Sequence, residues 1–424
     1  MVQRKIPLRK ILYISYDGMT DPLGQSQVLP YLIGLSEEGY RFTILSFEKK
    51  ERYAKNRKTI EAITSAANIE WVPLSFTTKP PIVSKFYDAI RMRRKAFALQ
   101  HHKKFDMVHC RSYVAADIGL SMKKKFGVKF FFDMRGFWAD EKRDGGAWRD
   151  DHFIFRRVYR YYKQKEAEYL YHADHIISLT NAGKIELMTW PSYNKEVPVS
   201  VIPCCADMDH FTATSEIQKH ESRKRLQLPS DGLIFSYLGS IGAWYMLDEM
   251  LEFFLTARNT FPQAHFLFIT HSDKQFILNR AALHQIPPEA ISVVEATRLE
   301  VPGFVKASDI NISFIKPVYS KISSSPTKLG EVLSMGIPVI VNSGVGDVEP
   351  IVRDNDCGIV VKAFTKEAYA NAIQQIPPLL KKDPVAIREG ILSIFDLDHG
   401  IELYSKAYHQ VFENSVEMAG RNCD

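Results

Sequence analysis

The stretch SSSPTKLGEVLSMGIPVIVNSGVGD, residues 323–347, contains a complete passage from a polar turn through a helix into a strand. The residues TKLGEVLSM predict a helix that ends at Gly336, and Pro338 opens the apolar strand PVIVN. A further apolar segment, INISFI, precedes the stretch at 310–315. Strand, helix and strand in this order predict a parallel β-α-β unit.

The same alternation extends toward both ends of the chain and divides into two sets. The first set of apolar strands is predicted at 11–15, 42–47, 107–111, 129–134 and 175–180. The second set is predicted at 233–239, 265–270, 292–296, 310–315, 338–342 and 358–362. Because these strands are apolar on both faces and are separated by helical patterns, we expect two parallel sheets covered by helices.

The predicted fold class is therefore α/β, with two Rossmann-like, doubly wound domains facing a cleft. We expect an N-terminal domain at 1–205, a polar hinge with prolines at 206–230, and a C-terminal domain at 231–394. A length of 424 residues favours two domains over one core. The amphipathic helix in 395–424 lies outside both sets of strands, and we expect it to pack back on the N-terminal domain.

The composition excludes several classes of protein. With 46% hydrophobic and 25% charged residues, the chain has the composition of a soluble globular protein. No apolar run approaches the roughly 18 to 20 residues of a membrane span, and the N-terminus does not resemble a signal peptide. The five cysteines are scattered without a CxxC pair, which predicts neither disulfides nor zinc and fits a reducing cytoplasm.

Lys328 and Glu331 place opposite charges in the helix of the opening stretch. Lys328 lies in the first turn, where the helix dipole disfavours a cation unless an anion is also bound. Glu331 lies about one turn deeper and leaves a carboxylate for sugar hydroxyls. A lysine for phosphate and a glutamate for ribose would together hold a nucleotide. The alternative is an ion pair on the surface of an ordinary helix.

Gly24 is a second candidate phosphate neighbour. It lies in a turn-rich loop after the first strand, before a helix predicted from Gln25–Gln27 to Glu38. A small residue beside a helix N-terminus lets an anion approach unpaired N–H groups. The alternative is a plain tight turn, because the loop does not match the GxGxxG dinucleotide fingerprint.

Three segments resemble the retaining, GT-B-fold glycosyltransferases of family four. They are DGMTDPLGQSQVLPYLIGL (17–35), VIPCCADMDHF (201–211) and SSPTKLGEVLSMGIPVIVNSGVGD (324–347). The similarity runs from the first strand to about residue 365. It implies a nucleotide-diphosphate sugar held mainly by the C-terminal domain and an acceptor held mainly by the N-terminal one.

The resemblance also implies roles for residues of the opening stretch. Glu331 matches the second Glu of a family motif of two glutamates separated by seven residues, the one that binds the donor ribose. Lys328 would neutralise the diphosphate and is the first catalytic candidate. The first Glu of the motif falls at Ser323, so backbone groups of Ser324 and Ser325 are expected in its place.

The loop LGSIGAWYMLDEM, 238–250, departs from the family pattern. Many members have an Arg and a Lys here, after the first strand of the C-terminal domain. Gly239, Ser240 and Gly242 can still offer backbone donors to a phosphate. Arg298, which follows the third strand of this domain, is expected to flank the base.

The segment FFFDMRGFWADE, 130–141, stands where many members of the family place a histidine. Asp133, Arg135 and Glu141 cluster there, with Arg111 at the end of the preceding strand. Asp133 is expected to orient a sugar or acceptor hydroxyl, and Arg135 to meet an acceptor phosphate, so both are catalytic candidates. The alternative is a structural network of ion pairs.

Two short acidic motifs, DMD (207–209) and DND (354–356), resemble the metal-binding Asp-x-Asp of a different glycosyltransferase fold. The first lies in the hinge and the second in a turn before a strand. We expect both to be structural, with no obligatory metal and no cofactor besides the UDP- or GDP-linked donor.

The basic stretch 84–104 contains seven Lys or Arg against one Asp, and Phe86, Ile90 and Phe97 are expected on one helical face. Three interpretations remain open: a solvated helix, a nucleic-acid surface, or contact with anionic lipid through residues 85–104. No RNA-binding signature accompanies the charge, so we expect no nucleic-acid partner.

The predicted function is a metal-independent, retaining hexosyltransferase. It would move a sugar from a nucleotide donor to a saccharide or lipid-linked saccharide in surface polysaccharide biosynthesis, in the cytoplasm at the inner face of the membrane. Two alternatives remain: a nucleotide-sugar epimerase of the same two-domain shape, and a non-catalytic nucleotide-sugar-binding subunit.

Overall fold

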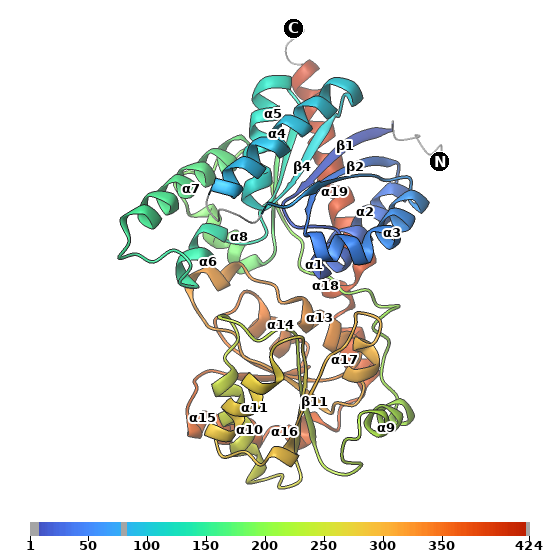
Figure 1. Cartoon of the computed structure of the whole chain (residues 1–424), viewed down its shortest axis with the longest axis vertical. Helices are drawn as coiled ribbons and strands as arrows, with labels where there is room; N and C mark the ends of the chain where they lie inside the picture. The colour runs from blue at the N-terminus through green and yellow to red at the C-terminus, as the bar shows by residue number, and fades with distance from the viewer. Residues whose placement is uncertain (1–7, 78–82, 421–424) are drawn as a thin grey trace. The chain divides into compact units, whose positions relative to one another are not determined.

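The computed structural model describes residues 8–77 and 83–420. The chain forms two compact units: unit 1 comprises Met1–Pro203 with Leu397–Asp424, and unit 2 comprises Cys204–Asp396. Each unit is an α/β structure with helices around a parallel sheet (Figure 1). The segment expected as a hinge, 206–230, falls within unit 2, where it carries the helix α9 (Glu216–Arg225).

Unit 1 contains a seven-stranded parallel sheet in the order β3-β2-β1-β4-β5-β6-β7. Its strands are β1 (Arg9–Ser15), β2 (Tyr40–Glu48), β3 (Glu70–Ser75), β4 (Met107–Arg111), β5 (Lys129–Asp133), β6 (His175–Ser178) and β7 (Val199–Val201). The five predicted strands are all present. Two strands were missed, because β3 is partly exposed and contains a proline, and β7 is only three residues long.

The helices of unit 1 follow the strands in alternation. They are α1 (Pro22–Gln27), α2 (Leu29–Glu37), α3 (Lys50–Ala66), α4 (Val83–Lys103), α5 (Ser112–Phe126), α6 (Trp138–Asp144), α7 (Phe153–His172), α8 (Asn181–Met188) and α19 (Leu397–Gly420). The single helix predicted from Gln25–Gln27 to Glu38 is wrong: the helix breaks at Val28. Pro30 has no N–H for the carbonyl four residues earlier, which explains the break.

Two helices cover opposite faces of β4 and β5. Gly119 of α5 lies so close to Cys110 and Phe130 that an added Cβ would be 2.3 Å from the Cys110 sulfur. On the other face, His109 and Phe131 contact the ring of Tyr408 in α19. Successive residues of a strand point to opposite faces, so α5 and α19 enclose the sheet between them. The last helix of the chain thus belongs to unit 1, where it also packs on α2 (Figure 1).

Unit 2 contains a six-stranded parallel sheet in the order β10-β9-β8-β11-β12-β13. Its strands are β8 (Ile234–Leu238), β9 (His265–Ile269), β10 (Ile291–Val294), β11 (Ile310–Ser313), β12 (Val339–Asn342) and β13 (Gly358–Val361). All six predicted strands are present. The strand order reverses between β8 and β11, and ligands of such sheets bind beyond the carboxyl ends of the strands at this point.

The helices of unit 2 surround its sheet (Figure 1). Besides α9 they are α10 (Leu247–Arg258), α11 (Lys274–Leu283), η1 (Pro288–Ala290), α12 (Val301–Val305), η2 (Tyr319–Ser323), α13 (Thr327–Ser334), α14 (Val348–Asp354), α15 (Lys366–Ile373), α16 (Ile376–Leu379), α17 (Pro384–Gly390) and α18 (Leu392–Phe395). Separate hydrophobic clusters fill the two sides of this sheet. The hydrogen bond from Lys328, in the first turn of α13, to Tyr237 of β8 places the start of this helix beside the carboxyl end of β8.

Candidate functional site

Lys328 lies in the first turn of α13 and is buried beside two tyrosines. Its Nζ donates a hydrogen bond of 3.0 Å to the hydroxyl of Tyr237. The same Nζ lies 4.2 Å from the ring centre of Tyr237 and 3.7 Å from that of Tyr245. Burial lowers the pKa of Lys328 well below its usual value, and Glu331 raises it to a smaller extent. An anion beside this amine would restore the charge that burial disfavours.

The loop after β8 approaches the same amine. Gly239 has a φ of +116°, and an added Cβ would lie 3.1 Å from the Nζ of Lys328. The Gly239 amide donates to the Ile269 carbonyl and the Ile241 amide to the Ser272 hydroxyl. Among the described residues, no acceptor receives the amides of Ser240 and Gly242. The sequence indicated Gly239, Ser240 and Gly242 as backbone donors. The Gly239 amide is already bonded within the protein, which corrects that prediction, whereas Ser240 and Gly242 are exposed.

Glu331 pairs with Arg298 and not with Lys328. The Nη1 of Arg298 lies 3.7 Å from Oε1 of Glu331, and the carbonyl of Arg298 lies 3.1 Å from Nε2 of His210. Burial raises the pKa of the Glu331 carboxyl, and the charges of Arg298 and Lys328 lower it to a smaller extent. The alternative of a surface ion pair between Lys328 and Glu331 is thus wrong. The structure instead brings two residues predicted for the donor, Glu331 and Arg298, into contact.

The serines before α13 are largely engaged with the protein itself. The Ser323 hydroxyl donates to Ser320, and the Ser324 amide donates 3.1 Å to the Lys321 carbonyl, which closes the short helix η2. The Ser325 hydroxyl accepts from the Cys204 amide at 3.1 Å. The Ser324 amide, expected to replace a motif glutamate, is therefore already bonded. The Ser324 carbonyl and the Ser325 backbone are the groups of this segment that remain available to a nucleotide-sugar donor.

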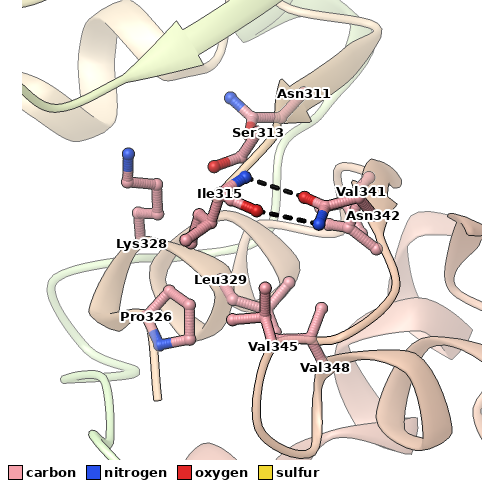
Figure 2. Close-up of a pocket in the computed structure, with 11 residues that line it drawn as sticks. Asn311, Ser313, Ile315, Pro326, Lys328, Leu329, Val341, Asn342, Val345 and Val348 are labelled. Carbon is pink, nitrogen blue, oxygen red and sulfur yellow. Dashed lines mark hydrogen bonds between the residues drawn. The ribbon is translucent and has the colours of Figure 1, made fainter. Parts of the chain in front are cut away.

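A pocket lies beside Lys328 and reaches Val345 and Val348 (Figure 2). Its lining combines polar side chains of Asn311, Ser313 and Asn342 with apolar groups from β12, α13, α14 and the segments that connect these elements. Asn342 accepts from the Ile315 amide at 2.7 Å and donates to the Ile315 carbonyl at 2.8 Å. These two bonds, drawn as dashed lines in Figure 2, fix the end of β11 against β12.

Unit 1 contains a second buried charged cluster, at the ends of β4 and β5. Asp133 is 1% exposed, and its Oδ2 lies 3.5 Å from Nε2 of His109 and 3.9 Å from Nη1 of Arg111. The Nη1 of Arg135 lies 4.0 Å from Oδ1. The Tyr404 hydroxyl of α19 donates to Oδ2 at 3.2 Å. The structure thus brings Asp133, Arg111 and Arg135 together.

The charges of this cluster control its protonation. Burial alone would raise the pKa of Asp133, but Arg135, His109 and Arg111 lower it below its ordinary value. Burial lowers the pKa of His109, which favours the neutral ring. Oδ1 of Asp133 and Nη1 of Arg111 have no hydrogen-bond partner within the described part of the chain. Glu141, the fourth predicted member, lies on α6.

Gly24 lies inside α1, and close packing accounts for its lack of a side chain. An added Cβ would lie 2.2 Å from the Gly18 carbonyl oxygen and 2.6 Å from the Met19 Cα. The same loop is fixed by Glu48, which accepts from the amides of Met19 and Thr20 at 2.8 and 3.1 Å.

The two Asp-x-Asp motifs have structural partners. Asp207 accepts from the amides of Asp209 and His210 at the turn after β7. Asp354 pairs with Arg353, and Asp356 pairs with Lys382. Within residues 8–77 and 83–420, no group of three or more His, Cys, Asp or Glu is arranged to hold a metal ion.

The basic stretch 84–104 forms most of α4. Phe86 and Ile90 are 62% and 52% exposed, among exposed Lys and Arg side chains. Phe97 is half-buried, unlike Phe86 and Ile90, because its ring packs on Phe126 of α5 at 5.1 Å. No helix of the described chain combines the length and the apolar composition that a membrane span requires.

The sequence pattern did not indicate several residues of these sites. Tyr237 lies in a predicted strand, where an aromatic residue is indistinguishable from ordinary core. His109 and Tyr404 are far apart in the sequence from each other, and nothing local connects them with Asp133. The only available signal was the spacing of Tyr404 and Tyr408 in the last helix, which places two tyrosines on one face.

Comparison with solved structures supports the fold. The sucrose-phosphate synthase of Thermosynechococcus elongatus is 17% identical, with a TM-score of 0.70 over 96% of this chain and 100% of that chain. Anabaena HepE in complex with UDP and glucose is 10% identical, with a TM-score of 0.70 over 95% and 99% of the two chains. The lipopolysaccharide outer core galactosyltransferase WaaB is 14% identical, with a TM-score of 0.61 over 94% and 99%.

Family models account for most of the sequence, although no curated protein matches it. The model described as Glycosyltransferase Family 4 matches residues 28–210. The model described as Glycosyl transferases group 1 matches residues 218–381. With two Rossmann-like units that match GT-B structures, the chain belongs to the group 1 glycosyltransferases of the GT-B fold.

Proposed function

We propose that the chain is a retaining hexosyltransferase that takes its sugar from a UDP- or GDP-linked donor bound at unit 2. The observation that carries the donor site is the buried Lys328 amine at the N-terminus of α13. It lies beside a glycine-rich loop whose Ser240 and Gly242 amides are exposed. An amine, two amides and a helix N-terminus are a suitable set of groups for a diphosphate. HepE was solved with UDP and glucose, which favours UDP as the first nucleotide to test.

The proposed chemistry depends on stabilising the leaving group. The bond between the sugar C1 and the diphosphate oxygen breaks with its electron pair on the diphosphate. The acceptor hydroxyl oxygen bonds to C1, and its proton passes to the departing diphosphate oxygen. Lys328, the α13 amides and the loop amides would stabilise that charge as it develops. Glu331, held by Arg298, would accept hydrogen bonds from the ribose hydroxyls. This set needs neither a metal ion nor a cofactor.

We place the acceptor at unit 1, near Asp133 and Arg135. Asp133 keeps a low pKa and an oxygen without a hydrogen-bond partner among the described residues, so it can accept from an acceptor hydroxyl. Arg111 brings a buried guanidinium to the same place. A saccharide or a lipid-linked saccharide with a phosphate fits this combination of carboxylate and cations.

The exposed Phe86, Tyr87 and Ile90 of α4, surrounded by cations, support contact with anionic lipid. Such contact would bring the enzyme to lipid-linked acceptors of surface polysaccharide assembly. Co-sedimentation with anionic vesicles tests this: Phe86→Ser with Ile90→Ser should reduce binding, and neutral vesicles should bind little. Equal binding of the variant and the wild type would contradict it.

Calorimetric titration with UDP and with GDP, without added metal, tests the donor site. One nucleotide should bind, Lys328→Ala should weaken its binding on the order of tenfold or more, and Glu331→Ala should also weaken it. Lys366→Ala, which removes an exposed lysine of α15, is the control and should bind as the wild type does. If neither nucleotide binds, or if binding survives both changes, the donor site is wrong. Loss of binding upon addition of EDTA would contradict metal independence.

A second candidate function is a non-catalytic nucleotide-sugar-binding subunit, because Ser323 occupies the place of the first motif glutamate. Slow release of free sugar from the bound donor by the purified chain would favour the transferase. Tight nucleotide binding without release of sugar or transfer would favour the subunit.

A further inference from the structure

The hydroxyl of Tyr237 connects the two parts of the proposed donor site. Tyr237 lies in β8 and its side chain is fully buried. The hydroxyl accepts a hydrogen bond of 3.0 Å from the Nζ of Lys328 and donates one of 2.8 Å to the carbonyl of Ser240. One phenol thus contacts the amine of α13 and the loop after β8 at once.

We propose that Tyr237 is a positioning residue for donor binding, whose hydroxyl holds Lys328 and the loop after β8 in the arrangement that receives the diphosphate. This inference rests on the proposed function and names a residue that the sequence did not indicate.

The geometry around Lys328 supports this role. A lysine ammonium has three N–H donors, and the Tyr237 hydroxyl takes one of them. The ring faces of Tyr237 and Tyr245 lie against the same nitrogen and favour its charged form. The amine is thereby held at one place, with the remaining donors available to an anion.

The geometry of the loop supports it as well. The Ser240 carbonyl points to Tyr237, while the amide of the same peptide, that of Ile241, donates 2.7 Å to the hydroxyl of Ser272. The peptide is therefore held by one hydrogen bond on each side. The Ser240 carbonyl oxygen therefore stays bonded to the Tyr237 hydroxyl, where its partial negative charge does not repel an incoming diphosphate.

Tyr237→Phe tests the proposal because it removes both hydrogen bonds and keeps the ring. We expect UDP or GDP to bind on the order of tenfold more weakly by calorimetry, the loss typical of a hydrogen bond to a charged group. Tyr369→Phe is the matched control: its hydroxyl is buried in the same unit and has no hydrogen-bond partner among the described residues. It should bind the nucleotide as the wild type does.

A double-mutant cycle separates positioning from a structural role. In a Lys328→Met background, Tyr237→Phe should cost much less than in the wild type, because its main partner is absent. An equal loss in both backgrounds would overturn the proposal. If Lys328→Met weakens binding and Tyr237→Phe does not, the inference fails while the donor site stands. If the wild type binds neither nucleotide, both the inference about Tyr237 and the proposed donor site fail.

The pH dependence of binding gives an independent readout. The groups that face Lys328 are Tyr237 and Tyr245 from β8 and its loop, and Glu331 from its own helix. Loss of the hydroxyl removes an acceptor that favours the ammonium form of Lys328. As the pH rises, nucleotide binding by Tyr237→Phe should therefore begin to weaken at a lower pH than binding by the wild type. Titrations between about pH 7.5 and about pH 9 avoid the ionisation of a terminal phosphate, whose pKa is near 6. An unchanged profile would contradict the proposal.

Discussion

At the scale of the residue, Lys328 is an unfavourable element of the fold, because its amine is buried. A buried amine without a carboxylate in contact loses hydration, and the Tyr237 hydroxyl and two ring faces offset only part of that loss. Groups of this kind, placed where a parallel sheet reverses its strand order, are typical of functional sites. The same residue therefore weakens the folded state, and a bound anion would offset that effect.

Lys328→Met should stabilise the ligand-free protein at neutral pH. The pKa of Lys328 is lower in the folded than in the unfolded state. Burial of this lysine therefore destabilises the folded protein at low pH, and the destabilisation decreases as the pH rises toward the lysine pKa of the unfolded chain. The variant should be more stable than the wild type at neutral pH, and this gain should shrink in alkaline buffer. Chemical denaturation at several pH values measures it. A gain that does not change with pH would contradict the assignment.

Gly239→Ala should destabilise unit 2 by about 1–3 kcal/mol and weaken nucleotide binding. The backbone has a φ of +116°, and the new Cβ would meet the Lys328 amine. Thermal unfolding and UDP titration measure the two effects. Gly232→Ala is the control, since Gly232 has a φ of +99° and its Cβ would contact Gln263. It should lose stability and keep its affinity. Equal loss of affinity in both variants would mean that strain alone disturbs the site.

At the scale of the element, the charged cluster of unit 1 depends on how closely α5 and α19 approach β4 and β5. The glycine of α5 allows its helix to rest on Cys110 and Phe130, while α19 supplies Tyr404 and Tyr408 from the other face. His109 lies between Asp133 and Tyr408, whose hydroxyl is 2.6 Å from its Nδ1. The positions of the helices thus determine the hydrogen bonds of the cluster.

Gly119→Ala should destabilise the protein by about 1–3 kcal/mol through overpacking between α5 and the sheet. Its Cβ would lie 2.3 Å from the Cys110 sulfur and 2.8 Å from the Phe130 ring. Gly303→Ala in α12 provides a contrast, because its Cβ would approach only Arg225, at 3.9 Å. Denaturant unfolding should show a loss for the first variant and little change for the second. Equal stability of both would contradict the close approach of α5.

At the scale of the whole molecule, the chain leaves unit 1 at Pro203 and returns to it at Leu397. Each unit has its own sheet and its own buried side chains, so each has a separate source of stability. The final helix α19 contributes Ile401, Tyr404, Tyr408 and Val411 to the interior of unit 1. Unit 1 is therefore completed only by the end of the chain.

Removal of α19 after Asp396 should unfold unit 1 and spare unit 2. Each large apolar side chain withdrawn from the interior costs about 1.5–3 kcal/mol, and a domain has only about 5–15 kcal/mol in total. Hydrogen exchange should show loss of protection in β1 to β7, with β8 to β13 still protected. Preserved protection of β4 and β5 in the truncated protein would contradict the role of α19.

Local patterns in the sequence were sufficient for much of the fold. The apolar strands and the helices between them were predicted because a buried parallel strand reads as a short apolar run. The helix break at Val28 and the strands β3 and β7 were missed, since proline and partial exposure obscure the pattern. The segments that resemble family four predicted the family, and the two family models match it.

The sequence by itself determined the two α/β sets, the family, and the placement of Lys328 and Glu331 on one helix that follows β11. Only the tertiary structure decided what those side chains meet. The contact of Lys328 with Tyr237 spans 91 residues of the chain, and that of Tyr404 with Asp133 spans 271. Periodicity reports which face of an element is buried, but not which distant side chain lies opposite. That choice depends on the packing of whole elements, and with it the burial that lowers the pKa of Lys328.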